Sequence, residues 1–99
     1  MSRTVYVNGQ YLPEEEAKIS VFDRGFLFAD AVYEVTSVIG GQLVDSEAHM
    51  ERLARSLNEL RMDMPLGASE IEAIERELVE RNALDEGGVY IQAGRGAAD

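Results

Sequence analysis

Residues 23–34 read Asp-Arg-Gly-Phe-Leu-Phe-Ala-Asp-Ala-Val-Tyr-Glu, and this stretch joins a turn to the most strand-like part of the chain. Asp23-Arg24-Gly25 is typical of a turn, with glycine at the position that is most strained for other residues. From Ala31 to Ile39 most residues are β-branched or aromatic, which predicts a strand. Because apolar residues occupy both alternating sets, we expect this strand to be central in a sheet and covered on both faces.

Two glycine-containing turns predict hairpins on either side of this stretch. Asn8-Gly9 separates Thr4–Val7 from residues 10–12, and Asn-Gly is the strongest short signal for a β-hairpin because both residues adopt positive φ. Gly40-Gly41 predicts the second hairpin, in which residues 42–44 pair back on the long strand.

Two helices and a last strand are predicted to follow. Apolar residues at helical spacing indicate an amphipathic helix over 46–61. The capping box Ser69-Glu70-Ile71-Glu72 predicts a second helix over 69–82, and residues 89–93 form the last strand. This order predicts an α+β fold with a two-layer domain, in which two helices cover one face of a mainly antiparallel sheet.

Composition excludes several classes of function. The 99 residues suffice for one domain with a single modest core. With 9 basic and 19 acidic residues the net charge is −10, which disfavours nucleic acid as a partner because phosphate contacts need a positive surface. No apolar run reaches the roughly 18–20 residues that cross a bilayer, and we see no secretory signal pattern at the first residues. The chain contains no cysteine, and a cytoplasmic protein is the expectation.

The residues that could carry chemistry are few. One histidine and no cysteine disfavour a zinc or copper site, so no metal is expected. His49 and Arg52 lie three residues apart on a predicted helix, hence on the same face, where they could present a cation and a hydrogen-bond donor to an anion. The alternative, which is the commoner case, is that both are ordinary surface residues near a helix start.

Tyr33 and Glu34 are neighbours on the long strand, so their side chains point to opposite faces of the sheet. A tyrosine at the start of a central strand usually belongs to the core, with its hydroxyl at a wet edge. Lys18, the only lysine, is interpreted as an exposed residue of a short extended segment over 18–22. Residue chemistry alone therefore predicts a soluble α+β domain with a candidate anion site at Arg52.

Three motifs taken together resemble the class IV aminotransferases, the fold-type-IV pyridoxal-phosphate enzymes. They are residues 23–35, the segment His49-Met50-Glu51-Arg52-Leu53 and the final Tyr90-Ile91-Gln92-Ala93-Gly94-Arg95-Gly96. The resemblance covers nearly the whole chain, and three motifs in the right order are specific at the family level. Tyr33-Glu34 after the Asp-Arg-Gly-Phe-Leu-Phe run favours the D-amino-acid aminotransferase branch over branched-chain aminotransferases and aminodeoxychorismate lyase.

The resemblance implies roles for individual residues. Arg52 stands at the position whose arginine binds the phosphate of pyridoxal 5'-phosphate in the family, with His49 as a supporting residue. Tyr33 stands where the family's tyrosine lines the substrate pocket and helps to hold the substrate carboxylate. The family's catalytic lysine and the glutamate that pairs with the pyridine nitrogen belong to a second domain, and Lys18 matches neither role. No catalytic residue is therefore expected within residues 1–99. Gly94 stands where the family often has threonine, a small departure.

The resemblance also implies what the whole protein does. Residues 1–99 would be the N-terminal small domain of an aminotransferase whose C-terminal catalytic domain is absent, and this part alone would be inactive. The whole enzyme would act on an amino acid, D-alanine or another D-amino acid, and a 2-oxo acid. It would form a homodimer, where Phe26-Leu27-Phe28 could be buried; the alternative is that these three pack inside the same lobe. A non-catalytic interaction domain is the rival hypothesis, motivated by the missing lysine and the net charge of −10.

Overall fold

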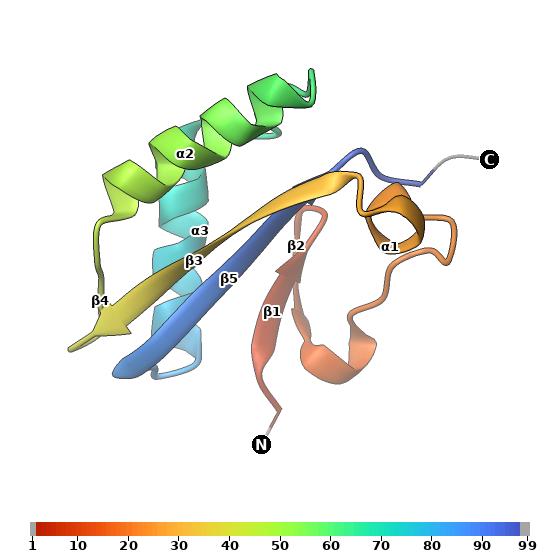
Figure 1. Cartoon of the computed structure of the whole chain (residues 1–99). Coiled ribbons are helices and arrows are strands. Elements are labelled where there is room, and N and C mark those ends of the chain that lie inside the picture. The colour runs from red at the N-terminus through yellow and green to blue at the C-terminus, as the bar shows by residue number, and fades with distance from the viewer. Residues whose placement is uncertain (1, 98–99) are drawn as a thin grey trace.

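The long strand predicted over 31–39 is the central strand of the computed structural model, which describes residues 2–97 (Figure 1). It pairs antiparallel with a short strand on one side and with the last strand on the other. A separate two-stranded hairpin precedes it, and the predicted α+β class is confirmed. The elements in chain order are β1 (Thr4–Val7), β2 (Gln10–Pro13), the 3₁₀ helix η1 (Glu14–Glu16), α1 (Arg24–Phe28), β3 (Ala31–Ile39), β4 (Gln42–Leu43), α2 (Ser46–Glu59), α3 (Ala68–Arg81) and β5 (Glu86–Gly94).

Both predicted hairpins form, and the register of the sheet fixes which residues face inward. Asn8 and Gly9 take φ values of 47° and 95°, as the tight turn between β1 and β2 requires. In the three-stranded sheet, β3 pairs along its whole length with β5, from Ala31 opposite Gly94 to Ile39 opposite Glu86. β4 pairs only with the last two residues of β3, so the other edge of β3 is largely unpaired near its start.

The core lies between the sheet and the two long helices, which sit on one side of it, α3 behind β3 and β5 in Figure 1. Alternation along β3 points residues 34, 36 and 38 toward the helices and leaves 33, 35 and 37 on the outer face. Two apolar clusters fill this layer. The first joins Met50, Leu53, Leu57 and Ile71, and the second joins Val38, Val79 and Val89.

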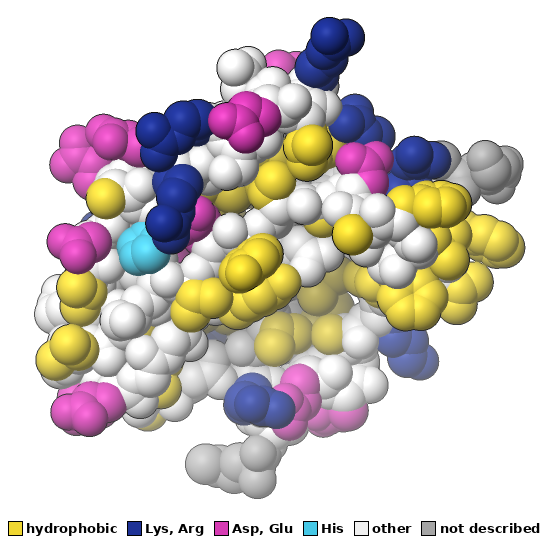
Figure 2. All heavy atoms as spheres, viewed as in Figure 1, with side chains coloured by type: hydrophobic (Ala, Val, Ile, Leu, Met, Phe, Trp, Pro, Cys, Tyr) yellow, Lys and Arg dark blue, Asp and Glu magenta, His cyan; other side chains and the backbone are white. Residues whose placement is uncertain are grey.

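The prediction that β3 is covered on both faces is wrong for this chain. Both long helices pack on the inner face, and no described element covers the outer one, where Tyr33, Val35, Ile39 and Tyr90 are exposed. Figure 2 shows hydrophobic side chains over the middle of this face. Apolar residues on both faces of a strand indicate that both faces are buried by other elements. The pattern does not tell whether those elements belong to the same chain.

The turn predicted at residues 23–25 is instead the start of a short helix. The Asp23 carboxylate accepts hydrogen bonds from the backbone N–H of Gly25 at 2.8 Å and of Phe26 at 3.4 Å, which caps α1. Ala29 then takes a left-handed φ of 56° and ends it. A Cβ atom on Gly25 would lie 3.3 Å from that of Ala31, so glycine lets α1 pack tightly on the strand that follows.

Two further predictions and one alternative need correction. Residues 17–20 have no regular structure and 21–22 form a turn, so the extended segment over 18–22 is wrong, although Lys18 is exposed as expected. The capping box does not form, because α3 begins at Ala68 with Gly67 as its N-cap. The side chains of Phe26, Leu27 and Phe28 are exposed, so they do not pack inside this lobe. No helix in the described part of the chain is long and apolar enough to span a bilayer.

Candidate functional site

Glu34 is a buried acid on the face of β3 that packs against α2. Its side chain is only 4% exposed, yet both carboxylate oxygens have partners. The guanidinium of Arg52 donates to it through Nε at 2.8 Å and Nη2 at 2.9 Å, in a bidentate fork, and His49 Nδ1 lies 2.7 Å from Oε1. Because His49 and Arg52 are three residues apart on α2, one helical face brings both to the same carboxylate.

This trio of Glu34, His49 and Arg52 is held together electrostatically. The Arg52 hydrogen bonds keep the pKa of the Glu34 carboxyl below its ordinary value, although burial opposes the shift, and His49 adds a smaller lowering effect. The same hydrogen bonds raise the pKa of Arg52. At neutral pH the trio therefore contains a carboxylate and a guanidinium whose plane is fixed by the fork.

The trio leaves part of the arginine facing solvent. The Arg52 side chain is 59% exposed, and its contacts with Glu34 come from Nε and Nη2, so the Nη1 edge is not used by that carboxylate. In Figure 2 basic side chains lie directly beside the single histidine, at the surface. Neither of the two interpretations of His49 and Arg52 was complete. Both residues reach the surface, and both are also anchored by a buried acid that we did not predict as their partner.

Tyr33 lies on the other face of the sheet, as the alternation predicts, but it is not a core residue. Its side chain is exposed and stacks on Tyr90 of β5, with ring centroids 5.7 Å apart and planes 16° from parallel. The Tyr90 hydroxyl donates to Gln92 Oε1 at 2.8 Å. Tyr33 has a small raising effect on the pKa of Arg52, which lies beyond the start of β3 on α2. No direct contact joins the two among the described residues.

A second charged group fixes the beginning of β3. The Asp30 carboxylate accepts from Arg95 Nε at 2.7 Å and from Arg24 Nε at 3.1 Å, and both arginines lower the pKa of this acid, Arg95 more strongly. Arg95 also donates through Nη2 to the Leu60 carbonyl at 2.7 Å. Asp30 thus ties α1, the end of β5 and the end of α2 to the residue that precedes the strand of Tyr33 and Glu34.

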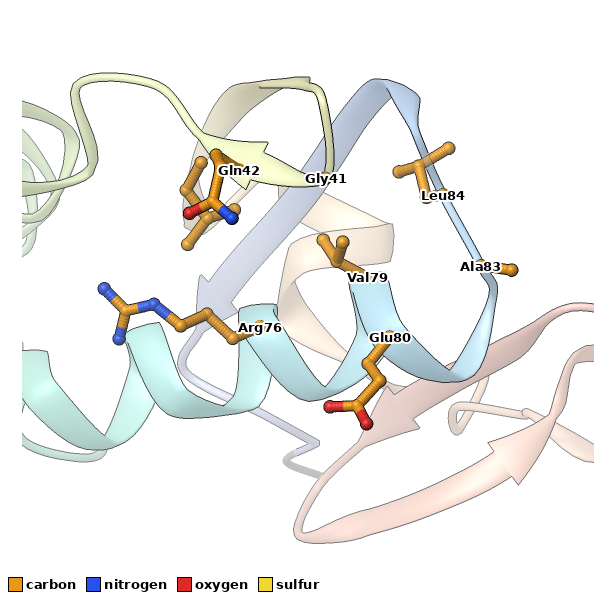
Figure 3. A pocket seen from close by; sticks show the side chains of 8 residues that line it. Gly41, Gln42, Arg76, Val79, Glu80, Ala83 and Leu84 are labelled. Atoms are coloured by element: carbon orange, nitrogen blue, oxygen red, sulfur yellow. The ribbon is translucent and has the colours of Figure 1, made fainter.

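Two hollows in the surface lie away from these residues. One, of about 380 Å³, lies between the turn at Gly41 and the second half of α3, with Arg76, Glu80 and Leu84 around it (Figure 3). The other, of about 370 Å³, lies between α2 and the segment before α3. Neither includes Arg52 or Tyr33, and in residues 2–97 no three His, Asp or Glu side chains are arranged to hold a metal ion.

The class of protein follows from comparison with known families. The family model for the amino-transferases of class IV matches residues 31–99, which include β3, the trio and β5. The chain belongs to the class IV aminotransferases. The resemblance that the three motifs indicated is therefore confirmed.

Several relatives show how this class IV chain compares in length and fold. D-alanine aminotransferase of Staphylococcus aureus strain N315 is 39% identical over 95 residues, which are 96% of this chain and 34% of that protein. The Bacillus licheniformis enzyme of the same name is 35% identical over 94 residues. A branched-chain amino acid aminotransferase from T.th., solved in complex with N-(5'-phosphopyridoxyl)-L-glutamate, superposes with a TM-score of 0.91 at 26% identity, over 100% of this chain and 35% of that one. The chain spans about a third of the length of these relatives.

Glu34 and Tyr90 are the residues of the class IV chain that sequence reasoning did not assign to the site. Glu34 could have been found from the sequence, because it is the one acid in the inward-facing set of β3, whose other members are Val32, Thr36 and Val38. A carboxylate at such a position needs a cation, and the helix that follows supplies one. The stacking of Tyr90 on Tyr33 depends on the pairing of β3 with β5, which the sequence leaves open.

Proposed function

We propose that this chain is the cofactor-phosphate-binding part of a pyridoxal-phosphate-dependent aminotransferase. The whole enzyme would move an amino group between D-alanine or another D-amino acid and a 2-oxo acid. The observation that carries the proposal is the bidentate fork between Glu34 and Arg52, because it fixes the surface guanidinium of the residue to which the resemblance assigns phosphate binding. Membership of class IV and 39% identity with D-alanine aminotransferases support the choice of reaction and substrate.

The residues present suit the phosphate of pyridoxal 5'-phosphate. A phosphate dianion is recognised best by a guanidinium edge that offers parallel N–H donors, and Arg52 has its Nη1 edge free of Glu34. Glu34 and His49 would orient that edge, since a guanidinium held by a buried carboxylate does not swing away. The cofactor, when bound, supplies an electron sink that stabilises negative charge on the substrate α-carbon.

The other residues of this chain would shape the substrate side. Tyr33 presents an exposed ring and hydroxyl on the outer face of β3, held in place by stacking on Tyr90. In this position it would border the bound amino acid and donate to its carboxylate. Lys18 is exposed in the loop before α1, so we give it no role. We propose that the lysine that accepts and returns the substrate proton belongs to the part of the enzyme that corresponds to the longer relatives' remaining length, and that residues 1–99 alone do not transfer amino groups.

The uncovered apolar surface supports a proposal about assembly. Tyr33, Val35 and Ile39 on the sheet and Phe26 and Phe28 on α1 are all exposed, and large apolar patches of this kind mark contact surfaces. We propose that the rest of the enzyme and a second subunit cover them in a homodimer. The cytoplasmic location stays a prediction from the sequence.

Substrate choice can be tested with the complete protein. We expect the enzyme loaded with pyridoxal phosphate to convert D-alanine and a 2-oxo acid to pyruvate and the corresponding amino acid. L-leucine should react far more slowly, and aminodeoxychorismate should not be cleaved. Preferred turnover of L-leucine would instead support the second candidate, a branched-chain aminotransferase, which the likeness to the solved branched-chain enzyme favours. Cleavage of aminodeoxychorismate would support the lyase, and no reaction with any of the three compounds would support the non-catalytic interaction domain. Residues 1–99 alone serve as the inactive control.

A further inference from the structure

Glu75 is a second buried acid, and neither the phosphate site nor the substrate side uses it. The buried side chains of α3 are Ile71, Glu75 and Val79, four residues apart and hence on one face. Glu75 is 0% exposed. It faces Thr36 of β3, which is equally buried and lies between Glu34 and Val38 on the inner side of the strand.

The pair of Glu75 and Thr36 separates the two apolar clusters of the core. Ile71, one turn before Glu75, belongs to the cluster with Met50, Leu53 and Leu57. Val79, one turn after it, belongs to the cluster with Val38 and Val89. The polar pair therefore lies at the middle of the contact between α3 and β3, with an apolar cluster on each side of it.

No cation neutralises Glu75 in the described part of the chain. Both of its carboxyl oxygens and the Thr36 hydroxyl are shielded from water and lack a partner of good hydrogen-bond geometry. The charged groups that act on Glu75 from neighbouring elements are Glu72 and Arg76 on α3 and His49 on α2. Arg76 is largely exposed and pairs with Glu72, while His49 pairs with Glu34. An ionised carboxylate without a partner is very costly to bury, so the neutral acid is the stable form here.

The direction of the pKa agrees with this geometry. Burial raises the pKa of the Glu75 carboxyl above its ordinary value, the Thr36 hydroxyl opposes the shift, and the Glu72 carboxylate adds to it. His49 and Arg76 oppose it by smaller amounts.

We propose that Glu75 is a neutral carboxylic acid in the folded chain and acts as a proton-linked latch, which holds α3 against β3 while protonated and loosens this contact when its proton is lost to water. The latch acts on the strand that carries Glu34, two residues from Thr36, and His49 is an ionisable neighbour of both acids. The inference concerns folding and does not depend on the proposed function.

The latch has a definite signature in the pH dependence of stability. In the unfolded chain Glu75 ionises near the ordinary glutamate pKa of 4.5, whereas the folded chain keeps its proton to higher pH. Between these two pKa values the folded state binds more protons than the unfolded state, so the free energy of unfolding falls as pH rises. Below the ordinary pKa, Glu75 is protonated in both the folded and the unfolded state, and its ionisation no longer lowers the free energy of unfolding.

Glu75→Gln tests this, because glutamine keeps the shape of the protonated acid and cannot ionise. We expect the urea midpoint of the unaltered chain to fall relative to that of E75Q as pH is raised from about 5 to about 9. Glu80→Gln makes the same change at an exposed position of the same helix and should follow the unaltered chain. Parallel curves for E75Q and the unaltered chain would overturn the proposal.

A second measurement needs no variant that could fail to fold. The carboxyl carbon of Glu75, assigned by NMR in the unaltered chain, should titrate at higher pH than those of the exposed glutamates. In Thr36→Val, which removes the opposing hydroxyl, this titration should shift to still higher pH. Titration of Glu75 together with the exposed glutamates would show that it is ionised when folded, and the latch would be ruled out.

Discussion

Arg52→Ala is expected to lower the free energy of unfolding measurably, because it leaves the buried Glu34 carboxylate with His49 as its remaining partner. Breaking a fully buried ion pair costs more, but the Arg52 side chain is 59% exposed, so water can enter the vacated space and solvate the carboxylate in part. Urea denaturation at neutral pH measures the difference directly.

Arg55→Ala is the matched control for this change. Arg55 lies on the same helix, is exposed, and has no ion pair among the described residues. Its removal should change stability by less than about 0.5 kcal/mol, as is usual at surface positions. A double-mutant cycle with Glu34→Gln should show that Arg52→Ala costs much less once the carboxylate is neutral. Equal effects of R52A and R55A would contradict the anchoring of Arg52 by Glu34.

Leu57→Ala should destabilise the fold more strongly than Arg52→Ala. Leu57 is 1% exposed and packs with Met50, Leu53 and Ile71, and truncating a leucine at such a site costs about 2–5 kcal/mol. A domain of this size has about 5–15 kcal/mol of stability in total, so L57A should be marginally folded at 37 °C. The thermal unfolding midpoint, measured by circular dichroism, should be much lower for L57A than for the unaltered chain.

Leu60→Ala removes the same atoms three residues further along the chain, at the residue that follows α2, where the side chain is 37% exposed. We expect a loss below about 1 kcal/mol, since most of the removed surface already faces water. If L60A and L57A lowered the midpoint equally, the core would not be centred on the inward face of α2 as described.

The local signals in the sequence were sufficient for most of the elements. Asn8-Gly9 and Gly40-Gly41 fix the hairpins because few residues tolerate the positive φ of such turns. The spacing of apolar residues fixes both long helices to within two residues of their ends. These are short-range properties, and they do not depend on what the rest of the molecule does.

Predictions that depend on long-range packing were weaker. The short helix at residues 24–28 depends on Asp23 reaching the backbone of Gly25, and a turn with the same residues has much the same local signature. Tyr33 is exposed because both long helices pack on the opposite face of the sheet. No local sequence pattern specifies on which face the helices pack.

The candidate site also combines features that local spacing predicts with features that depend on long-range packing. The spacing of His49 and Arg52 placed them together on one helical face, and the resemblance gave Arg52 its expected role. The residue that orients them was not predicted, because Glu34 meets α2 only after the chain has turned through β4. Glu75 was hidden for a related reason, since acids are common on α3 and only the packing shows which one is buried.

The arginine anchored by Glu34 is proposed to bind the phosphate of the cofactor. The most direct test compares the affinities of the complete protein for pyridoxal 5'-phosphate and for pyridoxal, which lacks the phosphate, by absorbance titration. Arg52→Ala should weaken pyridoxal phosphate binding by about 10- to 100-fold, the cost of lost charge-assisted hydrogen bonds, and leave pyridoxal binding unchanged. Arg55→Ala should affect neither. If Arg52→Ala lowered the affinity for both ligands equally, or did not lower the affinity for pyridoxal phosphate, Arg52 would not be the residue that binds the phosphate.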